Sequence, residues 1–171
     1  MAAPPRVGFW MRLIAAAIDV FAFFFVYISG FAFVQVATRS QMQWLESLLG
    51  PCVWLLYMLS EVLLAASPGK LILGLRIACV DAAPADFWRK FLRYSTKHFG
   101  VMLLLAYILT GFVGFYFISG IVNFFICVGF LFASNDDKQA WHDQWSGTAV
   151  YRSRDLLTDS AFPLVGPPPP L

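Results

Sequence analysis

The order of apolar and polar residues along the chain predicts a membrane protein. Residues 13–37 form a predominantly apolar run whose single charge is Asp19. A helix needs roughly 20 such residues to cross a hydrocarbon core about 30 Å thick, so this run predicts a first transmembrane helix. A cleaved signal peptide is the competing interpretation, but its apolar region would span only about 7–15 residues and would not contain an aspartate.

A second apolar run predicts a return across the membrane. It covers residues 48–66 and is interrupted by one charge, Glu61, near its end. Gly50 and Pro51 stand close to its beginning, where we expect them in the first turn of the helix, the place where proline is tolerated.

The third apolar run is too long for one crossing. Residues 100–133 contain no charge, and a single helix of this length would measure about 51 Å. Thr110, Gly111 and Gly114 offer a turn, which predicts a hairpin with a third helix over about residues 87–109 and a fourth over about 115–133. We therefore expect an all-α integral membrane protein with four transmembrane helices, with three as the alternative.

The basic residues predict the orientation of these spans. Residues 67–99 carry six of the twelve Lys and Arg residues, and Arg39 alone lies between the first two spans. The positive-inside rule then places the N-terminus and this loop in the cytoplasm, and four spans place the C-terminus there too. Tryptophans prefer the membrane interfaces. Four of them are predicted near the cytoplasmic interface: Trp10, Trp88, Trp141 and Trp145. Trp44 is predicted near the opposite interface.

Two short segments outside the spans favour β-structure. Residues 71–81 and 147–152 could pair as a small antiparallel ribbon on the cytoplasmic side, with residues 82–86 supplying a turn and the cap of the third helix. We expect residues 1–152 to form the transmembrane domain. Residues 153–171, which end in a proline run, then form a flexible tail.

Composition excludes several classes of protein. Apolar residues make up 60% of the chain and charged residues 13%, about half the usual share. A net charge of +2 is too small to indicate a nucleic-acid partner. Cys52, Cys79 and Cys127 are widely spaced, which argues against a disulfide framework or a zinc site. We expect no metal and no cofactor.

Catalytic and nucleotide-binding signatures are also missing from the sequence. Gly69 and Lys70 resemble the end of a phosphate-binding loop, but Leu64 stands where that motif requires glycine. The sequence contains no GxSxG or HExxH motif that would supply a nucleophile or metal ligands. We therefore expect a protein that is not an enzyme and has no catalytic residues.

Charged residues inside the spans are the candidates for function, because each costs about 2.5–3.5 kcal/mol at a helix centre. Arg12 and Asp19 are two helical turns apart and share a face, so we expect them to pair. Glu61 and Lys70 lie near the cytoplasmic end of the second span, which predicts a second ion pair.

A basic stripe begins the third helix. Arg89, Arg93 and Lys97 recur every fourth residue and repel one another unless anions are near. Lipid phosphates are the expected partners of the outer residues, Arg89, Lys90 and Lys97. Asp143 is a further partner for the stripe.

His142 offers a second role for the acidic residues. The alternative to a purely structural network is a proton-sensitive gate built by His142 with Asp19 and Glu61. His142 and Asp143 are neighbours whose side chains point about 100° apart on a helix, so we do not expect them to form a relay with each other. The predicted polar network comprises Arg12, Asp19, Glu61, Lys70, Arg93, His142 and Asp143.

These residues, in this order, resemble the RDD family of small membrane proteins, which is named for an arginine and two aspartates. Residues 12–19 match its R-to-D segment, residues 67–76 match its [ST]PGK and LGL[RK] signature, and residues 141–150 match its HD and TxV ending. Arg93 is similar to the arginine of the helix that follows the signature. The resemblance covers about residues 6–152 and implies a bacterial membrane protein, for which ion or solute transport has been proposed.

Two classes of function remain open on the sequence alone. The first is transport of a small ion or solute across the bacterial inner membrane by a multi-pass protein, as a homo-oligomer because four short spans enclose little volume. The second is an accessory or assembly subunit of a larger membrane complex. In either case the lipid bilayer is the expected partner, and nucleic acid is not.

Overall fold

The computed structural model describes residues 4–38 and 43–156, and side chains are described for residues 4–32 and 47–156. Arg39, the side chain of Trp44 and the proline run near the C-terminus lie outside the described residues. The elements follow in the order α1 (Phe9–Thr38), α2 (Gln43–Met58), α3 (Ser60–Leu64), α4 (Pro68–Ile72), β1 (Leu75–Cys79), α5 (Phe87–Thr110), α6 (Val113–Leu131), a 3-10 turn (Phe132–Ser134), α7 (Trp141–Ser146), β2 (Thr148–Arg152) and α8 (Ser153–Leu156).

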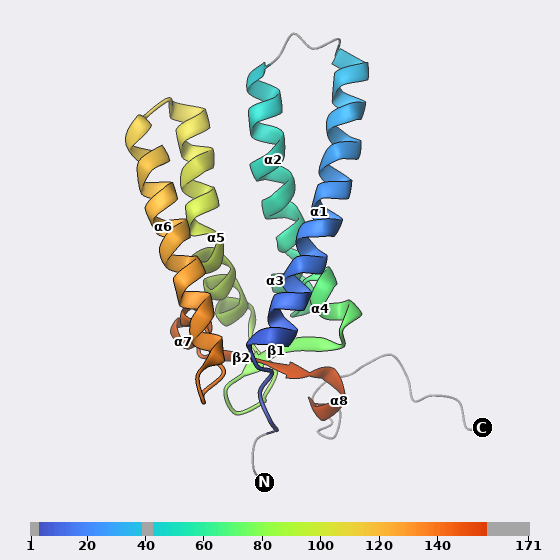
Figure 1. Cartoon of the computed structure of the whole chain (residues 1–171), viewed down its shortest axis with the longest axis vertical. Helices are drawn as coiled ribbons and strands as arrows, with labels where there is room; N and C mark the ends of the chain where they lie inside the picture. Colours follow the sequence, from blue (N-terminus) through green and yellow to red (C-terminus); the bar gives the residue numbers. More distant parts are fainter. Residues whose placement is uncertain (1–3, 39–42, 157–171) are drawn as a thin grey trace, which may run out of the picture.

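Four long helices stand on a small sheet as two hairpins, α1 with α2 and α5 with α6 (Figure 1). Within the described part of the chain, three stretches have the length and hydropathy to cross a membrane: Phe9–Ala32, Ser47–Leu64 and Val113–Ser134. Helix α5 is long enough, but charged residues crowd its first half. The structure thus shows a mostly helical protein with three candidate membrane spans and a fourth long helix beside them.

The α5–α6 hairpin forms where the sequence predicts it. Helix α5 starts at a cap on Asp86, whose Oδ1 accepts a hydrogen bond from the backbone N–H of Arg89 at 2.7 Å. It ends at Gly111, which has a φ of 70° and donates its N–H to the carbonyl of Tyr107. A residue with a side chain rarely adopts this left-handed conformation, so the predicted turn rests on this glycine.

The prediction for the start of the second span is wrong at Pro51. Helix α2 begins at Gln43, eight residues earlier, so Pro51 lies inside the helix and not in its first turn. The apolar run starts later than the helix because the first turns of α2 carry polar residues. The helix ends at Met58, and α3 continues to Ala65, whose φ of 56° reverses the chain.

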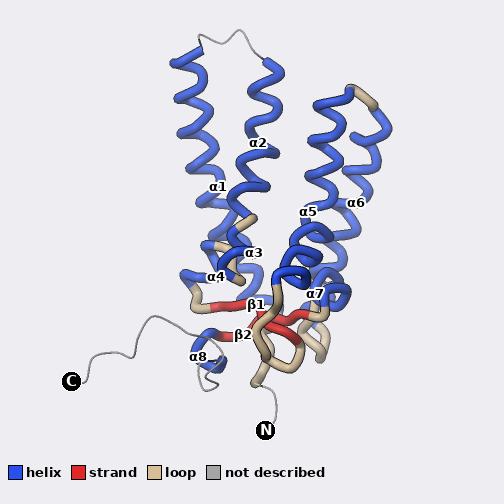
Figure 2. The backbone as a smooth tube through the Cα atoms, turned by 180° about the vertical axis from the view of Figure 1, so that it is seen from behind, coloured by secondary structure: helices blue, strands red, loops and turns tan. Residues whose placement is uncertain are grey.

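Strands β1 and β2 form a two-stranded antiparallel sheet (Figure 2). In its register Ile77 pairs with Val150. This sheet joins the two segments paired in the sequence analysis, although residues 71–74 belong to α4 and the turn after it. Neighbouring segments cover both outer edges: Val7 donates its N–H to the carbonyl of Val150 at 2.8 Å, and Ile77 donates to Ala65 at 2.7 Å. The sheet therefore links the N-terminus, the loop after α3 and the C-terminal segment.

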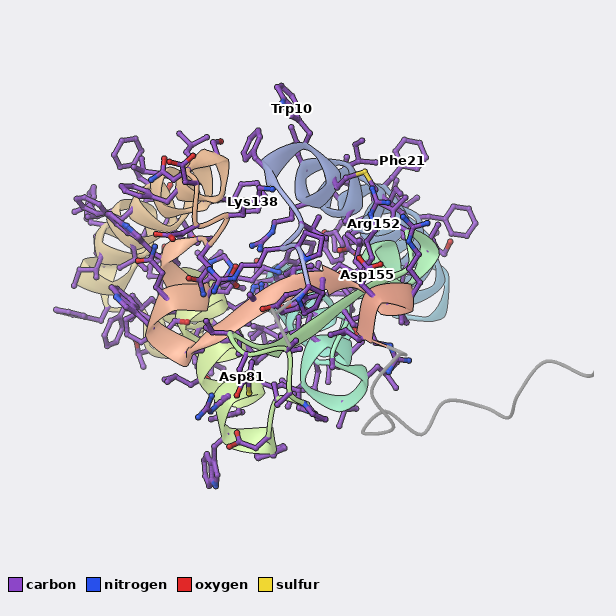
Figure 3. All side chains as sticks on the ribbon, turned by 90° about the horizontal axis from the view of Figure 1, so that it is seen from below. Trp10, Phe21, Asp81, Lys138, Arg152 and Asp155 are labelled. Atoms are coloured by element: carbon purple, nitrogen blue, oxygen red, sulfur yellow. The ribbon has the colours of Figure 1, made fainter. Side chains whose placement is uncertain are left out.

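The fold continues past the predicted domain boundary at residue 152. Leu156 in α8 is buried and packs with Ala78, Ala149 and Tyr151 of the sheet. The side chains on the outer surface of the helices are mostly apolar, and Figure 3 shows Trp10 and Phe21 projecting outward from α1. An exposed apolar surface of this extent is typical of a protein surrounded by lipid.

Candidate functional site

Asp19 holds α4 against α1. Its Oδ1 accepts hydrogen bonds from the backbone N–H of Gly69 at 2.7 Å and the hydroxyl of Tyr57 at 3.4 Å, and its Oδ2 accepts one from Ser67 Oγ at 2.5 Å. A Cβ on Gly69 would lie 2.2 Å from the carbonyl oxygen of Ala15. Only glycine allows this approach, which explains the glycine of this Ser-Pro-Gly segment.

The predicted Arg12–Asp19 pair is wrong. The two residues are seven positions apart, which corresponds to about 10.5 Å along the helix axis. The carboxylate of Asp19 is already bound by neutral donors. Arg12 instead reaches down to α7, where its NH1 donates to Asp143 Oδ2. Its Nε donates to the carbonyl of Val7 at 2.9 Å and its NH2 to that of Lys138 at 2.7 Å. All three nitrogens of this buried guanidinium are thus used.

Arg93 joins the two carboxylates at the centre of the network. Its Nε donates to Asp143 Oδ1 at 2.7 Å and its NH1 to Glu61 Oε2 at 3.0 Å, and the side chain is 3% exposed. A planar guanidinium can bridge two acids in this way because its donors point in fixed, diverging directions. Helices α3, α5 and α7 are therefore tied together at one point.

The buried carboxylate of Glu61 binds three cationic side chains. Its Oε1 accepts from Lys70 Nζ and, at 2.8 Å, from Lys97 Nζ, while its Oε2 accepts from Arg93. The predicted Glu61–Lys70 pair is confirmed. Lys97 lies one helical turn after Arg93 and reaches the same carboxylate. Its predicted contact with lipid phosphates stays a prediction.

Arg89 and Lys90 lie apart from this network. The side chain of Arg89 is half exposed, and its NH1 lies 3.3 Å from Cys79 Sγ. Lys90 is partly buried at the start of α5. Contact of these two residues with lipid phosphates stays a prediction.

The environment of α7 fixes the charge of its two ionisable residues. Burial raises the pKa of Asp143, but Arg93, His142 and Arg12 outweigh this effect and hold the pKa well below its usual range. Burial lowers the pKa of His142 to about 3 against the attraction of Asp143. Near neutral pH, Asp143 is therefore ionised and His142 is uncharged.

These contacts correct two predictions about His142. Its Nε2 lies 3.4 Å from Asp143 Oδ1 and 3.3 Å from Arg93 NH2. The neighbouring side chains thus do meet, because both turn toward Arg93. His142 contacts neither Asp19 nor Glu61 through the hydrogen bonds of the described residues, so the predicted gate does not form around it.

The surroundings of Lys70 shift its pKa toward neutral pH. Burial lowers the pKa of Lys70 to about 7, although Glu61 opposes the shift, and the nearby Arg93 and Lys97 lower it further. Near neutral pH, Lys70 therefore exchanges between its charged and its uncharged form. The network holds four cationic side chains and three carboxylates: Arg12, Lys70, Arg93 and Lys97, against Asp19, Glu61 and Asp143.

A cavity of about 420 Å³ lies between the two hairpins at the level of the network. Its polar lining comes from α1, α2, α4, α5, α6 and α7. These residues are Arg12, Asp19, Trp54, Lys70, Arg93, Lys97, His98, Asn123 and His142. Cavities of about this volume are typical of small-molecule sites. Among the described residues, no group of His, Cys, Asp and Glu is arranged to hold a metal ion.

Sequence reasoning missed three of the polar residues of this cavity, Trp54, His98 and Asn123. His98 is 3% exposed, and its Nδ1 accepts a hydrogen bond from the indole N–H of Trp54 at 3.2 Å. A histidine beside an apolar run is a usable signal, since ionisable residues in membrane segments usually have a function. A count of formal charges along the apolar run leaves out an uncharged imidazole.

The sequence model of the RDD family matches residues 6–147, most of the chain. The chain belongs to the RDD family. No curated protein and no solved structure matches the sequence. In this RDD protein the motif residues meet in space: Arg12 binds Asp143, and Asp19 binds the Ser67–Gly69 turn. The TxV residues 148–150 follow directly after the matched range and form most of β2.

Proposed function

We propose that this RDD protein crosses the bacterial inner membrane four times, as a multi-pass protein with both termini in the cytoplasm. Helix α5 is the fourth span. At 24 residues it measures about 36 Å, enough for the hydrocarbon core. Two of its charges, on Arg93 and Lys97, are neutralised by Asp143 and Glu61. Neutralised in this way, the helix can lie in the membrane beside α6.

The proposed orientation can be tested by labelling. Cys79 is a poor target because it is buried and its Sγ contacts Arg89. We instead choose Ala83, an exposed residue of the loop before α5, as Ala83→Cys in a protein whose native cysteines are replaced. An impermeant thiol reagent should label it in inverted membrane vesicles and not in intact cells. Labelling of intact cells would contradict the orientation.

We further propose that the protein transports a small ion or solute through the cavity between its hairpins. One observation supports this proposal most: the cavity lies between spans and is lined by Asp19 and by all four cations of the network. A membrane protein that only needed rigid helices would gain nothing from leaving charged groups beside open volume, because intramembrane charges are costly. Lys70, with its pKa of about 7, can exchange a proton there.

Transport can be tested in reconstituted vesicles with an internal pH dye. A panel of monovalent cations, small anions and amino acids is added outside, and at least one should collapse an imposed pH gradient faster than in empty vesicles. Ala16 lines the cavity, so Ala16→Phe should block this activity. Its neighbour Ala17 is exposed. Ala17→Phe is therefore the matched control, which should leave the transport activity unchanged. Equal rates in protein-containing and empty vesicles for the whole panel would contradict transport.

An accessory or assembly subunit is the second candidate. The observation that favours it is the full pairing of the guanidinium of Arg12, whose three nitrogens all have acceptors. Such a pair fixes helix positions without chemistry. In that case, mild detergent should extract the protein with partners of different sequence. A homo-oligomer, expected for the transport function, would instead contain copies of this chain only.

A further inference from the structure

One buried polar atom of the cavity lacks a partner. His98 is 3% exposed, and its Nε2 has no hydrogen-bond partner among the described residues. Buried polar groups nearly always have one. His98 lines the cavity, but its Nε2 is itself covered by neighbouring atoms in this structure. A small shift of the surrounding side chains would bring this nitrogen to a ligand atom in the cavity.

The hydrogen bond to Trp54 decides which kind of atom belongs there. An indole N–H can only donate, so His98 Nδ1 must accept and carries no proton. The neutral ring then carries its proton on Nε2, which is a donor. Its missing partner is therefore an acceptor, such as an oxygen of an anion.

Two ammonium groups that line the same cavity have donors to spare. Lys70 and Lys97 each have one acceptor among the described side chains, and it is the same oxygen, Glu61 Oε1. An ammonium has three donors. Both residues line the cavity, and the side chain of Lys97 is 23% exposed, the most of the buried network.

The charge that faces the cavity is positive. Glu61 and Asp143 do not line it, so Asp19 is the carboxylate among the described lining residues, against four cations. Both oxygens of Asp19 already accept hydrogen bonds. A cation would thus meet occupied acceptors and several like charges, whereas an anion would meet free donors.

The remaining lining is apolar, with Leu13, Val101, Ile126 and Phe130 among the residues that form it. A bare inorganic anion would leave these walls without a partner. A ligand with one anionic end and a short apolar body matches both parts of the cavity.

We propose that the cavity binds a small organic carboxylate, whose oxygens accept hydrogen bonds from Lys97 Nζ, Lys70 Nζ and His98 Nε2. This inference rests on the proposed transport function and names the class of its substrate. Binding can be measured without transport, so the two can fail separately.

The test is calorimetric titration of the whole detergent-solubilised protein with butyrate, inorganic phosphate or chloride as sodium salts at constant ionic strength. Butyrate should bind. Lys97→Met and His98→Phe should each weaken binding at least about tenfold, since each removes a donor to a charged group. His98→Gln keeps a donor near the position of Nε2 and should stay within about threefold of the parent. Arg154→Gln removes a positive charge from an exposed site outside the cavity and is the matched control.

The parent titration needs no variant and so does not depend on how well the variants fold. Absence of butyrate binding to the parent overturns the inference, even if vesicles transport another solute. Binding of phosphate without binding of butyrate also overturns the inference. Butyrate binding that is unchanged in both Lys97→Met and His98→Phe overturns it as well. Butyrate binding without any transport supports the inference and contradicts the proposed function.

Discussion

Two halves of the polar network use similar residues for different purposes. Around Asp143, the guanidinium groups of Arg12 and Arg93 have acceptors for their nitrogens, and Asp143 is fully buried. Around Glu61, the ammonium groups of Lys70 and Lys97 share one oxygen and face a cavity. In the arginine half every guanidinium nitrogen of Arg12 and Arg93 has an acceptor, and these bonds hold the helices in place. The lysine half keeps free donors, as a binding site requires.

The largest loss of stability should come from breaking the ion pair between Arg12 and Asp143 in the arginine half of the network. Arg12→Met leaves Asp143 with one guanidinium partner fewer in a buried site, which should destabilise the protein by about 3–5 kcal/mol. Thermal unfolding in detergent measures the loss. An Arg12→Met variant as stable as the parent would show that this pair does not hold the fold.

A similar loss should follow from Gly69→Ala, about 3 kcal/mol or more, because the new methyl group would overlap the carbonyl oxygen of Ala15. Gly8→Ala is the control, since the space around Gly8 is open. The yield of monodisperse protein and its unfolding temperature report the effect. Equal values for the two variants would contradict the tight contact between α4 and α1.

The lysine half should respond to pH where the arginine half does not. Lys70 has a lowered pKa of about 7 and faces Glu61, Arg93, Lys97 and Asp19. Its charged form dominates below pH 7 and is lost above, so butyrate affinity should fall as pH rises, by roughly tenfold between pH 6 and 8. Lys70→Arg stays charged and should remove this dependence. The same slope in both proteins would assign the effect to another group.

The smallest effects concern the donors to Asp19. Ser67→Ala removes a bond of 2.5 Å to a carboxylate and should cost about 1.5–3 kcal/mol, whereas Tyr57→Phe removes one of 3.4 Å and should cost less than about 0.5. Unfolding temperatures measured side by side rank the two. A reversed order would mean that the tyrosine hydroxyl, and not the serine, fixes Asp19.

The sequence predicts the helices well, because long apolar runs and the Gly111 turn depend on local composition. It also predicts the Glu61–Lys70 pair, since a short turn joins the two residues. It fails for Arg12, whose partner Asp143 lies 131 residues away and is brought near only when the sheet closes. Spacing along one helix shows which residues share a face, and not which neighbour that face meets.

His98 shows the same limit in another form. Its spacing from Lys97 and Arg93 is visible in the sequence, but its role depends on Trp54, which is 44 residues away on another helix. The bond to Trp54 fixes the tautomer and leaves Nε2 free. No pattern along α5 alone contains that information.

The most direct test of the central claim is nitrogen NMR of protein labelled with ¹⁵N-histidine, since the chain has two histidines. Arg93 donates to His142 Nε2, which places the proton of His142 on Nδ1, whereas His98 should carry its proton on Nε2. His98→Gln assigns the signals. Butyrate should shift the protonated Nε2 of His98 and leave His142 nearly unchanged. A proton on Nδ1 of His98, or an Nε2 signal that saturating butyrate does not move, would contradict the proposed site.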